Sequence, residues 1–430
     1  MSTSTGREND ADVIVVGAGP AGTACAYRLA RAGRTVLLVE RGQVAGGKNL
    51  SGGRLYTDAL ELVEPGMTAQ APWERAVVRE QIMLLDGDRS LTVAVAGAPV
   101  PDGDRPASVI VLRAGFDAWF AGRAEAAGVL LATGVRVDSL LVEHGRVVGI
   151  EAGGDRLRAD VVVAADGVSS LLGRAAGLVD APTPHAVGVG AKLVVGLDPA
   201  VIEARFGVGP GQGVATLMLG CTAGAHGGGF LYTNAASVSV GVVVAPDQVG
   251  ATGRTVPGLL QELRRHPAVL PLLDGGVPLE YGAHLVREDG WRGVPRRLAR
   301  DGFLVTGEAA GFVLNLGCTV RGMDLALLSG IAAAEAVLAG GDLEPAYRAA
   351  LDRVGLPATM RAARGYDDLL ALRRLYATYP ALGLDLAESL YTVGSGTPVP
   401  LRRQVRSAMR RRGVPLRSVL HDGLVGMRAL

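Results

Sequence analysis

The sequence predicts an α/β fold that opens with a Rossmann-like βαβ unit and ends in a helical tail. Apolar runs at 12–16 and 35–39 are typical of buried parallel strands, and a helical pattern over 20–33 lies between them. From about 185 to 290, apolar and polar residues alternate between glycine-rich turns, which predicts an antiparallel sheet. Residues 343–430 are helical in pattern and become basic toward their end.

Further elements connect these parts in chain order. We expect a helix at 116–128, a strand near 132–137, a hairpin turning at His144–Gly145, a buried strand at 160–165, a strand at 302–306 and a helix at 321–340. The pattern divides the chain into a discontinuous Rossmann-like domain (1–180 and 295–340), an inserted antiparallel-sheet domain for substrate or partner (181–294) and a helical basic region (341–430).

Composition narrows the function classes. The chain has 430 residues, of which 49% are hydrophobic and 20% charged, and its net charge is +1. A near-neutral chain offers no global field for nucleic acid. The cysteines, Cys25, Cys221 and Cys318, are far apart, so we expect neither a disulfide framework nor a metal site. Without an apolar leader or a long apolar run, the chain is expected in the cytoplasm.

A glycine fingerprint follows the first strand directly. Gly17, Gly19 and Gly22 form G-x-G-x-x-G, and Glu40 ends the second strand. These glycines permit a tight turn, close approach to a pyrophosphate and close helix–strand packing. The helix N-terminus adds free N–H groups and partial positive charge. The carboxylate of Glu40 can accept hydrogen bonds from ribose hydroxyls and would repel a 2′-phosphate.

Two later segments favour FAD over NAD. The stretch 165–170 (ADGVSS) and the stretch 307–311 (GEAAG) each follow a strand, and a helix is expected to start near Val320. A domain that binds only NAD needs neither segment, whereas a flavin must also be held at its ribityl chain and ring. The second helix N-terminus would face the flavin edge where negative charge gathers on reduction. We therefore predict an FAD-binding domain of the glutathione-reductase type.

Several motifs carry a family resemblance. The segments GAGPAG, GGKNLSGGRLY, LVTGEAAGFVLNLGCTVRGMDLALLSG and HDGLVGMRAL span the chain. Together they resemble the electron-transfer-flavoprotein:quinone oxidoreductase family, and more closely its FixC-type branch among the geranylgeranyl-reductase-like flavoproteins. The resemblance implies an FAD-dependent oxidoreductase that passes electrons from a reduced donor, such as an electron-transfer flavoprotein or a small molecule, to a quinone or a ferredoxin-like acceptor.

The resemblance also implies an FAD site, residue by residue. The glycine turn and the end of the second strand would hold the ADP part, Arg113 and Val135 would flank it, the loop 51–53 would run beside the flavin ring, and 307–317 would meet the ribityl and ring end. The full expected set is Gly17, Gly19, Pro20, Ala21, Gly22, Glu40, Arg41, Ser51, Gly52, Gly53, Arg113, Val135, Asp166, Gly307, Glu308, Gly311 and Gly317. No catalytic residue beyond the flavin is predicted.

The sequence departs from the family pattern at two points. Glu308 stands where the family usually has Asp, and its side chain is one methylene longer, so its contact is expected either to shift or to run through water. The larger oxidoreductases of the family carry an iron–sulfur domain, which needs four clustered cysteines. No cysteine follows Cys318, so a separate small ferredoxin would supply the cluster, as in the FixC-type branch. Cys318 itself is expected to be a small buried side chain.

Some alternatives stay open at this level. Lys48 and Arg54 flank the glycine-rich loop and are either partners of a reduced flavin or an acidic substrate, or solvated charges. A basic stretch is either a solvated helix face, a dock for an acidic ferredoxin or a peripheral contact with an anionic membrane; it comprises Arg402, Arg403, Arg406, Arg410, Arg411, Arg412 and Arg417. The alternative activity is that of an FAD-dependent tailoring enzyme, which would be a dehydrogenase, a double-bond reductase or a monooxygenase.

Overall fold

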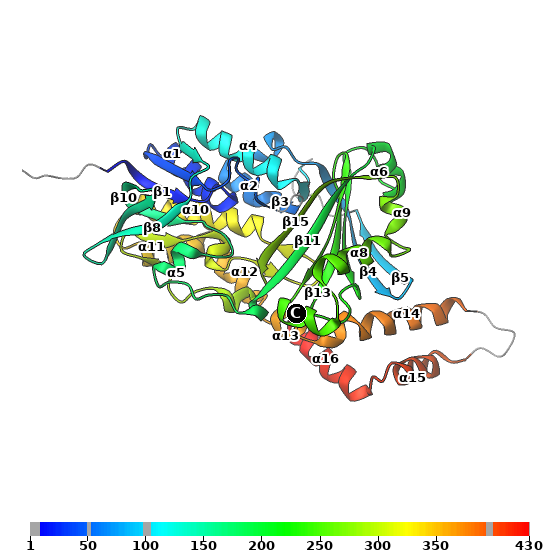
Figure 1. Ribbon diagram of the computed structural model, residues 1–430. Helices are drawn as coiled ribbons and strands as arrows, with labels where there is room; N and C mark the ends of the chain where they lie inside the picture. Colours follow the sequence, from blue (N-terminus) through cyan, green and yellow to red (C-terminus); the bar gives the residue numbers. More distant parts are fainter. Residues whose placement is uncertain (1–8, 50–52, 98–104, 393–398, 430) are drawn as a thin grey trace, which may run out of the picture.

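The computed structural model describes residues 9–49, 53–97, 105–392 and 399–429. Its main strands form two sheets that lie side by side, and the last helices of the chain extend beyond the second sheet (Figure 1). The chain therefore has the mixed α/β architecture and the helical C-terminal region that the sequence predicts.

The first sheet carries the predicted βαβ unit. Strands β7, β2, β1, β10 and β17 run parallel in that order, β16 pairs with β17, and β8 and β9 form a hairpin that continues from β10. The hairpin turns at His144 and Gly145 as predicted, and both residues have positive φ. The strands are β1 (Ala11–Val16), β2 (Val36–Glu40), β7 (Leu130–Thr133), β8 (Val137–Glu143), β9 (Arg146–Ala152), β10 (Asp155–Ala164), β16 (Ala299–Arg300) and β17 (Phe303–Val305).

Helix α1 (Pro20–Arg31), which follows the first strand, packs against helix α10 (Met323–Ala339), which follows the last strands of the sheet. They pack closely because small residues meet: a Cβ added to Gly330 would lie 2.2 Å from the carbonyl oxygen of Ala21. Helix α4 (Arg113–Ala126) packs against α1 and begins three residues before the expected position 116. The strand expected at 302–306 is β17, which is parallel to β10.

The second sheet contains the antiparallel strands expected between 185 and 290. Its order is β15-β11-β14-β13-β12-β4-β6-β3, with β5 beside β4, and the β12–β4 pair is parallel. The sheet also takes strands from 53–111, which precede the predicted range. The strands are β3 (Gly53–Tyr56), β4 (Arg75–Asp86), β5 (Arg89–Ala96), β6 (Ser108–Val111), β11 (Val187–Gly196), β12 (Gln212–Leu219), β13 (Gly227–Thr233), β14 (Ser237–Val244) and β15 (Val277–Arg287).

One face of the second sheet packs against helices and the other is left for the functional site. Alternate side chains of β14, among them Val238 and Val240, enter a buried core together with Leu259 and Leu263 of α8 (Val256–Arg265). Because neighbouring strand residues point to opposite faces, Val243 faces the cavity described below.

Short elements and the C-terminal helices complete the fold. The short elements are α2 (Thr57–Val63), α3 (Met67–Gln70), α5 (Leu171–Ala175), α6 (Pro199–Phe206), α7 (Pro246–Val249), α9 (Leu270–Leu273), β18 (Leu314–Asn315) and β19 (Val320–Arg321). The C-terminal helices are α11 (Leu343–Arg353), α12 (Leu356–Ala362), α13 (Tyr366–Leu370), α14 (Thr378–Tyr391), α15 (Leu401–Arg411) and α16 (Leu416–Ala429). Within the described segments, no helix has the length and apolarity needed to cross a bilayer.

Candidate functional site

A cavity of about 660 Å³ is lined by both sheets. Its volume lies within the usual range for small-molecule sites, about 300–1,000 Å³. Most of the expected cofactor residues line its wall, although they come from seven separate stretches of sequence. These are Gly17, Gly19, Pro20, Ala21, Glu40, Arg41, Gly53, Arg113, Val135, Asp166, Gly307, Glu308 and Gly317.

The remaining expected residues lie elsewhere. Gly22 and Gly311 do not line the cavity, and Ser51 and Gly52 lie outside the described residues. A Cβ on Gly22 would lie 1.9 Å from the carbonyl oxygen of Gly17, so this glycine is needed where the helix packs on the turn. Gly311 has φ +75°, and a Cβ there would lie 2.5 Å from the carbonyl oxygen of Gly293. Both positions shape the backbone around the cavity.

The glycine turn between β1 and α1 forms one end of the site. Gly17 has φ +105°, and a Cβ there would lie 2.3 Å from the carbonyl oxygen of Ala165, so the turn passes directly against the end of β10. Helix α1 begins at Pro20 with Gly19 as its N-cap and no acidic residue in its first turn. The N-terminal end of α1 is therefore suited to bind an anion such as a pyrophosphate.

Glu40 is held in place by the backbone on both sides. Its Oε2 accepts a hydrogen bond from the amide of Ala18 at 3.0 Å, and its Oε1 accepts one from the amide of Gly42 at 2.6 Å. A carboxylate has about four acceptor positions, so both oxygens can still accept hydrogen bonds from a ligand. The residue lines the cavity beside the glycine turn, as a ribose-binding carboxylate would.

Arg113 places a positive charge next to that turn. A Cβ on Gly19 would lie 3.8 Å from its Nη2. The guanidinium forms a bidentate pair with buried Asp117, through Nε at 2.9 Å and Nη2 at 2.6 Å. Burial alone would lower the pKa of Arg113, but Asp117 and Glu308 raise it, so the charge is retained. Asn49 also donates to Asp117 at 3.0 Å. The sequence indicated Arg113 but not the carboxylate that orients it.

Asp166 carries a buried oxygen without a partner. Its Oδ2 accepts a hydrogen bond from the amide of Leu172 at 2.9 Å, whereas its Oδ1 has no hydrogen-bond partner among the described residues. Burial raises the pKa of this carboxyl. Unsatisfied buried acceptors are costly, so a bound group with a hydroxyl or N–H donor would be stabilised there.

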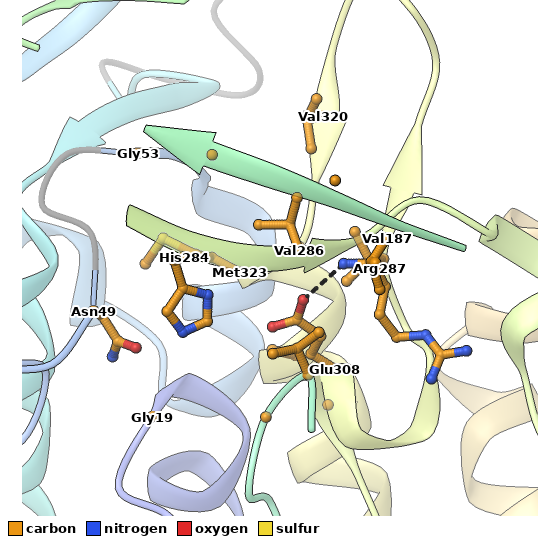
Figure 2. A pocket seen from close by; sticks show the side chains of 18 of the residues that line it. Gly19, Asn49, Gly53, Val187, His284, Val286, Arg287, Glu308, Val320 and Met323 are labelled. Carbon is orange, nitrogen blue, oxygen red and sulfur yellow. Dashed lines mark hydrogen bonds between the residues drawn. The ribbon is translucent and has the colours of Figure 1, made fainter. Parts of the chain in front are cut away.

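Two further acidic side chains, Glu288 and Glu308, line the cavity. Glu308 accepts a hydrogen bond from the amide of Arg287 at 3.1 Å, a contact to β15 that its longer side chain reaches (Figure 2). Glu288 accepts a hydrogen bond from Nδ2 of Asn315 at 2.8 Å. Burial raises the pKa of Glu308. Burial also raises the pKa of Glu288 to about 7, and the nearby charges of Asp289 and Glu308 add to this shift.

The N-terminus of α10 reaches the same cavity. Gly322 and Met323 line the wall, and the helix starts at Met323 rather than near Val320 as expected. Arg321 pairs with Asp324 of the first turn at 2.6 Å. A second helix N-terminus therefore lies at the cavity, where the sequence analysis expects it to meet the flavin edge.

Arg54 and Cys318 differ from what the sequence suggested, whereas Lys48 is compatible with both of its alternatives. Arg54 is not a solvated charge: Nη1 donates to Glu80 at 2.9 Å and the guanidinium lies 4.5 Å from the centre of the Tyr56 ring. Lys48 is exposed and lines the cavity. Cys318 is exposed, so the expectation of a buried side chain is wrong. It lies between β18 and β19, next to Gly317, which is also exposed.

The sequence analysis did not assign other wall residues a role in the site. Lys192 of β11 lies on the sheet face, and His226 stacks on Tyr376 with ring centroids 5.0 Å apart. His284 of β15 also lines the cavity (Figure 2). These residues meet only after the second sheet and the C-terminal helices fold together, so no local motif reveals them.

Comparisons with known proteins are consistent with this geometry. A family model described as FAD dependent oxidoreductase matches residues 12–180. The chain is 42% identical to "Probable electron transfer flavoprotein-quinone oxidoreductase YdiS" of Escherichia coli (strain K12), over 97% of this chain and 99% of that protein. It is 40% identical to "Protein FixC" of Salmonella typhi, over 97% and 99%. Among solved structures, a geranylgeranyl bacteriochlorophyll reductase-like protein from Thermoplasma acidophilum shares the fold, with TM-score 0.70, 18% identity and coverage of 94% and 96%.

Proposed function

The chain belongs to the family of FixC and electron transfer flavoprotein-quinone oxidoreductases, and from this premise we propose that it passes electrons from a reduced electron-transfer flavoprotein to a quinone. It is an FAD-dependent oxidoreductase. FAD held by these residues would supply one- and two-electron redox chemistry, which suits a link between protein carriers and quinone.

The single observation that carries the proposal is the continuity of the cavity. One space is lined by the glycine turn, by Glu40, by the unsatisfied Asp166 and by the N-terminus of α10, and it continues over the face of the second sheet. These helix N-termini and acceptor carboxylates fit the ADP, ribityl and ring parts of FAD. The chain's own work is to hold that cofactor and to leave the sheet side for an acceptor.

The residues near the ring end would supply orientation and charge. The N-terminal end of α10 would favour negative charge beside it. Glu308, fixed by the amide of Arg287, would accept a hydrogen bond from a ribityl hydroxyl. Arg113, fixed by Asp117, would offset the charge of the pyrophosphate.

Anaerobic reduction of the purified protein tests the proposal. We expect tightly bound FAD that is reduced by a reduced electron-transfer flavoprotein and reoxidised by a soluble quinone analogue. The same sample is then mixed with a ferredoxin and with oxygen. A protein that holds FAD but exchanges no electrons with either the flavoprotein or the quinone would contradict the proposal.

A small ferredoxin is a further proposed partner. Within the described part of the chain, no group of three or more His, Cys, Asp or Glu side chains is placed to hold a metal ion. Cys25 is buried and Cys318 is exposed, far apart in the sequence. Any iron–sulfur cluster would therefore belong to a separate ferredoxin. Electron exchange between a purified ferredoxin and the FAD of this chain would demonstrate that partnership.

We also propose a peripheral membrane contact at the C-terminal arm, α15 and α16. Both helices project beyond the second sheet (Figure 1). Four apolar residues lie at helical spacing on α16 and are between 53% and 66% exposed: Leu416, Leu420, Leu424 and Met427. Exposed arginines of the neighbouring α15 are Arg402, Arg403, Arg406 and Arg410. Apolar and basic side chains together are typical of helices that lie in a membrane interface, where quinones are found.

Vesicle sedimentation tests this contact. We expect binding to vesicles that contain anionic lipid, weaker binding to zwitterionic vesicles, and loss of binding when Leu420 and Leu424 are both changed to Gln. If vesicle binding is absent but electron transfer to a ferredoxin slows with salt, the arm is instead a dock for an acidic protein.

One observation supports the alternative activity, that of an FAD-dependent tailoring enzyme. The cavity wall includes the apolar side chains of Leu217, Leu219 and Val243 and the ring of Tyr376, which could contact an organic substrate. Rapid flavin reoxidation by oxygen in the presence of a small organic substrate, with none by quinone, would favour a monooxygenase.

The division into domains remains part of the proposal. We infer a glutathione-reductase-type FAD-binding part at 1–180 and 295–340, an inserted sheet part at 181–294 and a helical part at 341–430. The strands from 53–111 that join the second sheet would extend the sheet part. Limited proteolysis with FAD bound would map these boundaries.

A further inference from the structure

The second sheet presents a hollow to the cavity, with Lys192 at its centre. Lys192 of β11 lies opposite Gly241 of β14 on one side and Gly282 of β15 on the other. A Cβ on Gly241 would lie 2.3 Å from Cζ of Phe230, so this ring extends across the glycine toward the lysine. Lys192 and Gly241 belong to a row of residues that are paired across neighbouring strands. The row continues through Phe230 of β13 and Leu217 of β12, which also line the cavity. Along this row of the sheet, glycine and apolar residues thus flank Lys192.

The environment of Lys192 is unusual for an ammonium group. Its side chain is 2% exposed although it lines the cavity. Burial lowers its pKa to about 7, the carboxylate of Glu280 on β15 opposes this shift, and the charge of Arg113 on α4 adds to it. The other ionisable side chains of β13 and β15 that line the cavity are Tyr232, His284 and Arg287. The group can therefore gain and lose a proton near neutral pH.

The use of lysine at this point is selective. Only two of the 43 basic residues in the sequence are lysines, Lys48 and Lys192, and both line the cavity. Arginine keeps its proton at any pH at which a protein functions, whereas a buried lysine can release one. A chain that uses arginine at nearly every other basic position thus keeps lysine where proton exchange would be needed.

We propose that Lys192 is the proton donor of the reaction, and that it protonates a carbonyl oxygen of the quinone as that acceptor is reduced in the cavity. This role rests on the proposed function, since the two electrons come from the reduced FAD. An N–H bond of the Lys192 ammonium breaks and an O–H bond forms on the acceptor. The other quinone oxygen takes its proton from solvent. The neutral amine is then reprotonated from water, which completes the cycle.

Lysine NMR on the unmodified holoprotein gives a test that needs no turnover. Growth with lysine labelled with ¹³C at Cε yields two lysine signals, and the Lys48→Arg variant identifies the signal of Lys192. We expect the Lys192 signal to titrate near pH 7, as its burial requires. A Lys192 signal that stays protonated up to pH 9.5 would overturn the proposal, because such a lysine could not exchange protons at neutral pH.

Two variants test the role in turnover. Lys192→Arg keeps the charge but cannot release the proton, and Lys192→Met removes both. We expect quinone reduction to slow on the order of 10²-fold in both variants, with reduction of the bound FAD by the donor unchanged. In Lys192→Arg the KM for quinone should stay near that of the wild type, and the step in the pH profile near pH 7 should disappear.

The matched control is Arg79→Lys, a basic exchange on β4 whose guanidinium bonds to the carbonyl oxygens of Phe206 and Gly207, away from the cavity. It should leave both half-reactions unchanged. FAD content and thermal melting show whether each variant folds. A folded Lys192→Arg variant that reduces quinone at the wild-type rate refutes the role of Lys192 and leaves the proposed function standing. A wild-type protein that never reduces quinone refutes the proposed function instead.

Discussion

Replacement of Glu40 by Ala separates cofactor recognition from fold stability. In the folded chain the carboxylate accepts amide hydrogen bonds from Ala18 and Gly42, at 3.0 Å and 2.6 Å. A ribose diol would add two more. Charge-assisted hydrogen bonds contribute about 1.5–3 kcal/mol each, so loss of the diol contacts weakens FAD binding by about 3–6 kcal/mol. This corresponds to a rise in Kd of roughly 10²- to 10⁴-fold.

The same substitution also affects the protein without FAD. Two amides lose their acceptor, but Glu40 is only partly buried, so water can replace part of what is lost. We expect the free energy of unfolding of the apoprotein to fall by about 1–3 kcal/mol, measured by urea denaturation. FAD affinity is measured separately, by titration of the apoprotein with FAD under conditions where each variant is folded.

Glu61 offers a matched control. Its carboxylate also accepts two backbone hydrogen bonds, from Gly66 at 2.7 Å and Thr68 at 2.9 Å, but it does not line the cavity. Glu61→Ala should therefore lower stability by a similar amount and leave the Kd for FAD unchanged. The reasoning fails if folded Glu40→Ala binds FAD as tightly as the wild type, or if both variants weaken FAD equally.

Three further predictions follow from the site and the arm. Acid release and chromatography should yield FAD and not FMN, because the βαβ unit addresses the ADP half; release of FMN alone would contradict the site. Elemental analysis should find no stoichiometric iron in the isolated chain. At low pH the arm should detach: Arg412, with Arg89, holds the pKa of Asp385 at about 2 against the opposing effect of burial. A carboxyl whose folded pKa is depressed stabilises above its unfolded pKa, so docking should persist at pH 5 and be lost between about pH 4 and pH 2. Hydrogen exchange in α15 would show this loss, and unchanged exchange at pH 2 would speak against the ion pairs.

Much of the fold was predictable because it depends on local patterns. The βαβ unit, the hairpin at His144–Gly145 and the long helix α10 follow from apolar periodicity and glycine positions. The parts that the sequence did not indicate depend on pairing between distant segments. Strands from 53–111 join the second sheet through the parallel β4–β12 pair, and no local signal identifies a partner that far along the chain.

The same distinction holds for the site and the arm. Glu40 and the glycine turn lie within one motif, so their place at the cavity was expected. Lys192 depends on the register of β11 between two glycine-bearing strands. Arg412 was grouped with the basic stretch, yet it pairs with Asp385 at 2.7 Å and with Asp86 at 2.9 Å, which fastens the arm to α14 and β4. Arg402, Arg403, Arg406 and Arg410 of α15 and Arg417 of α16 are exposed, so they are available to a partner or a membrane.

The most direct test of the central claim is a stopped-flow experiment that links donor to acceptor. The FAD-loaded protein is mixed anaerobically with a reduced electron-transfer flavoprotein and a soluble quinone analogue, and the flavin absorbance and quinol yield are followed together. The account predicts that the bound flavin is reduced and then reoxidised, with one quinol formed for every two electrons delivered. Quinol formation at the same rate without the protein, or a flavin that stays reduced in the presence of quinone, would contradict it.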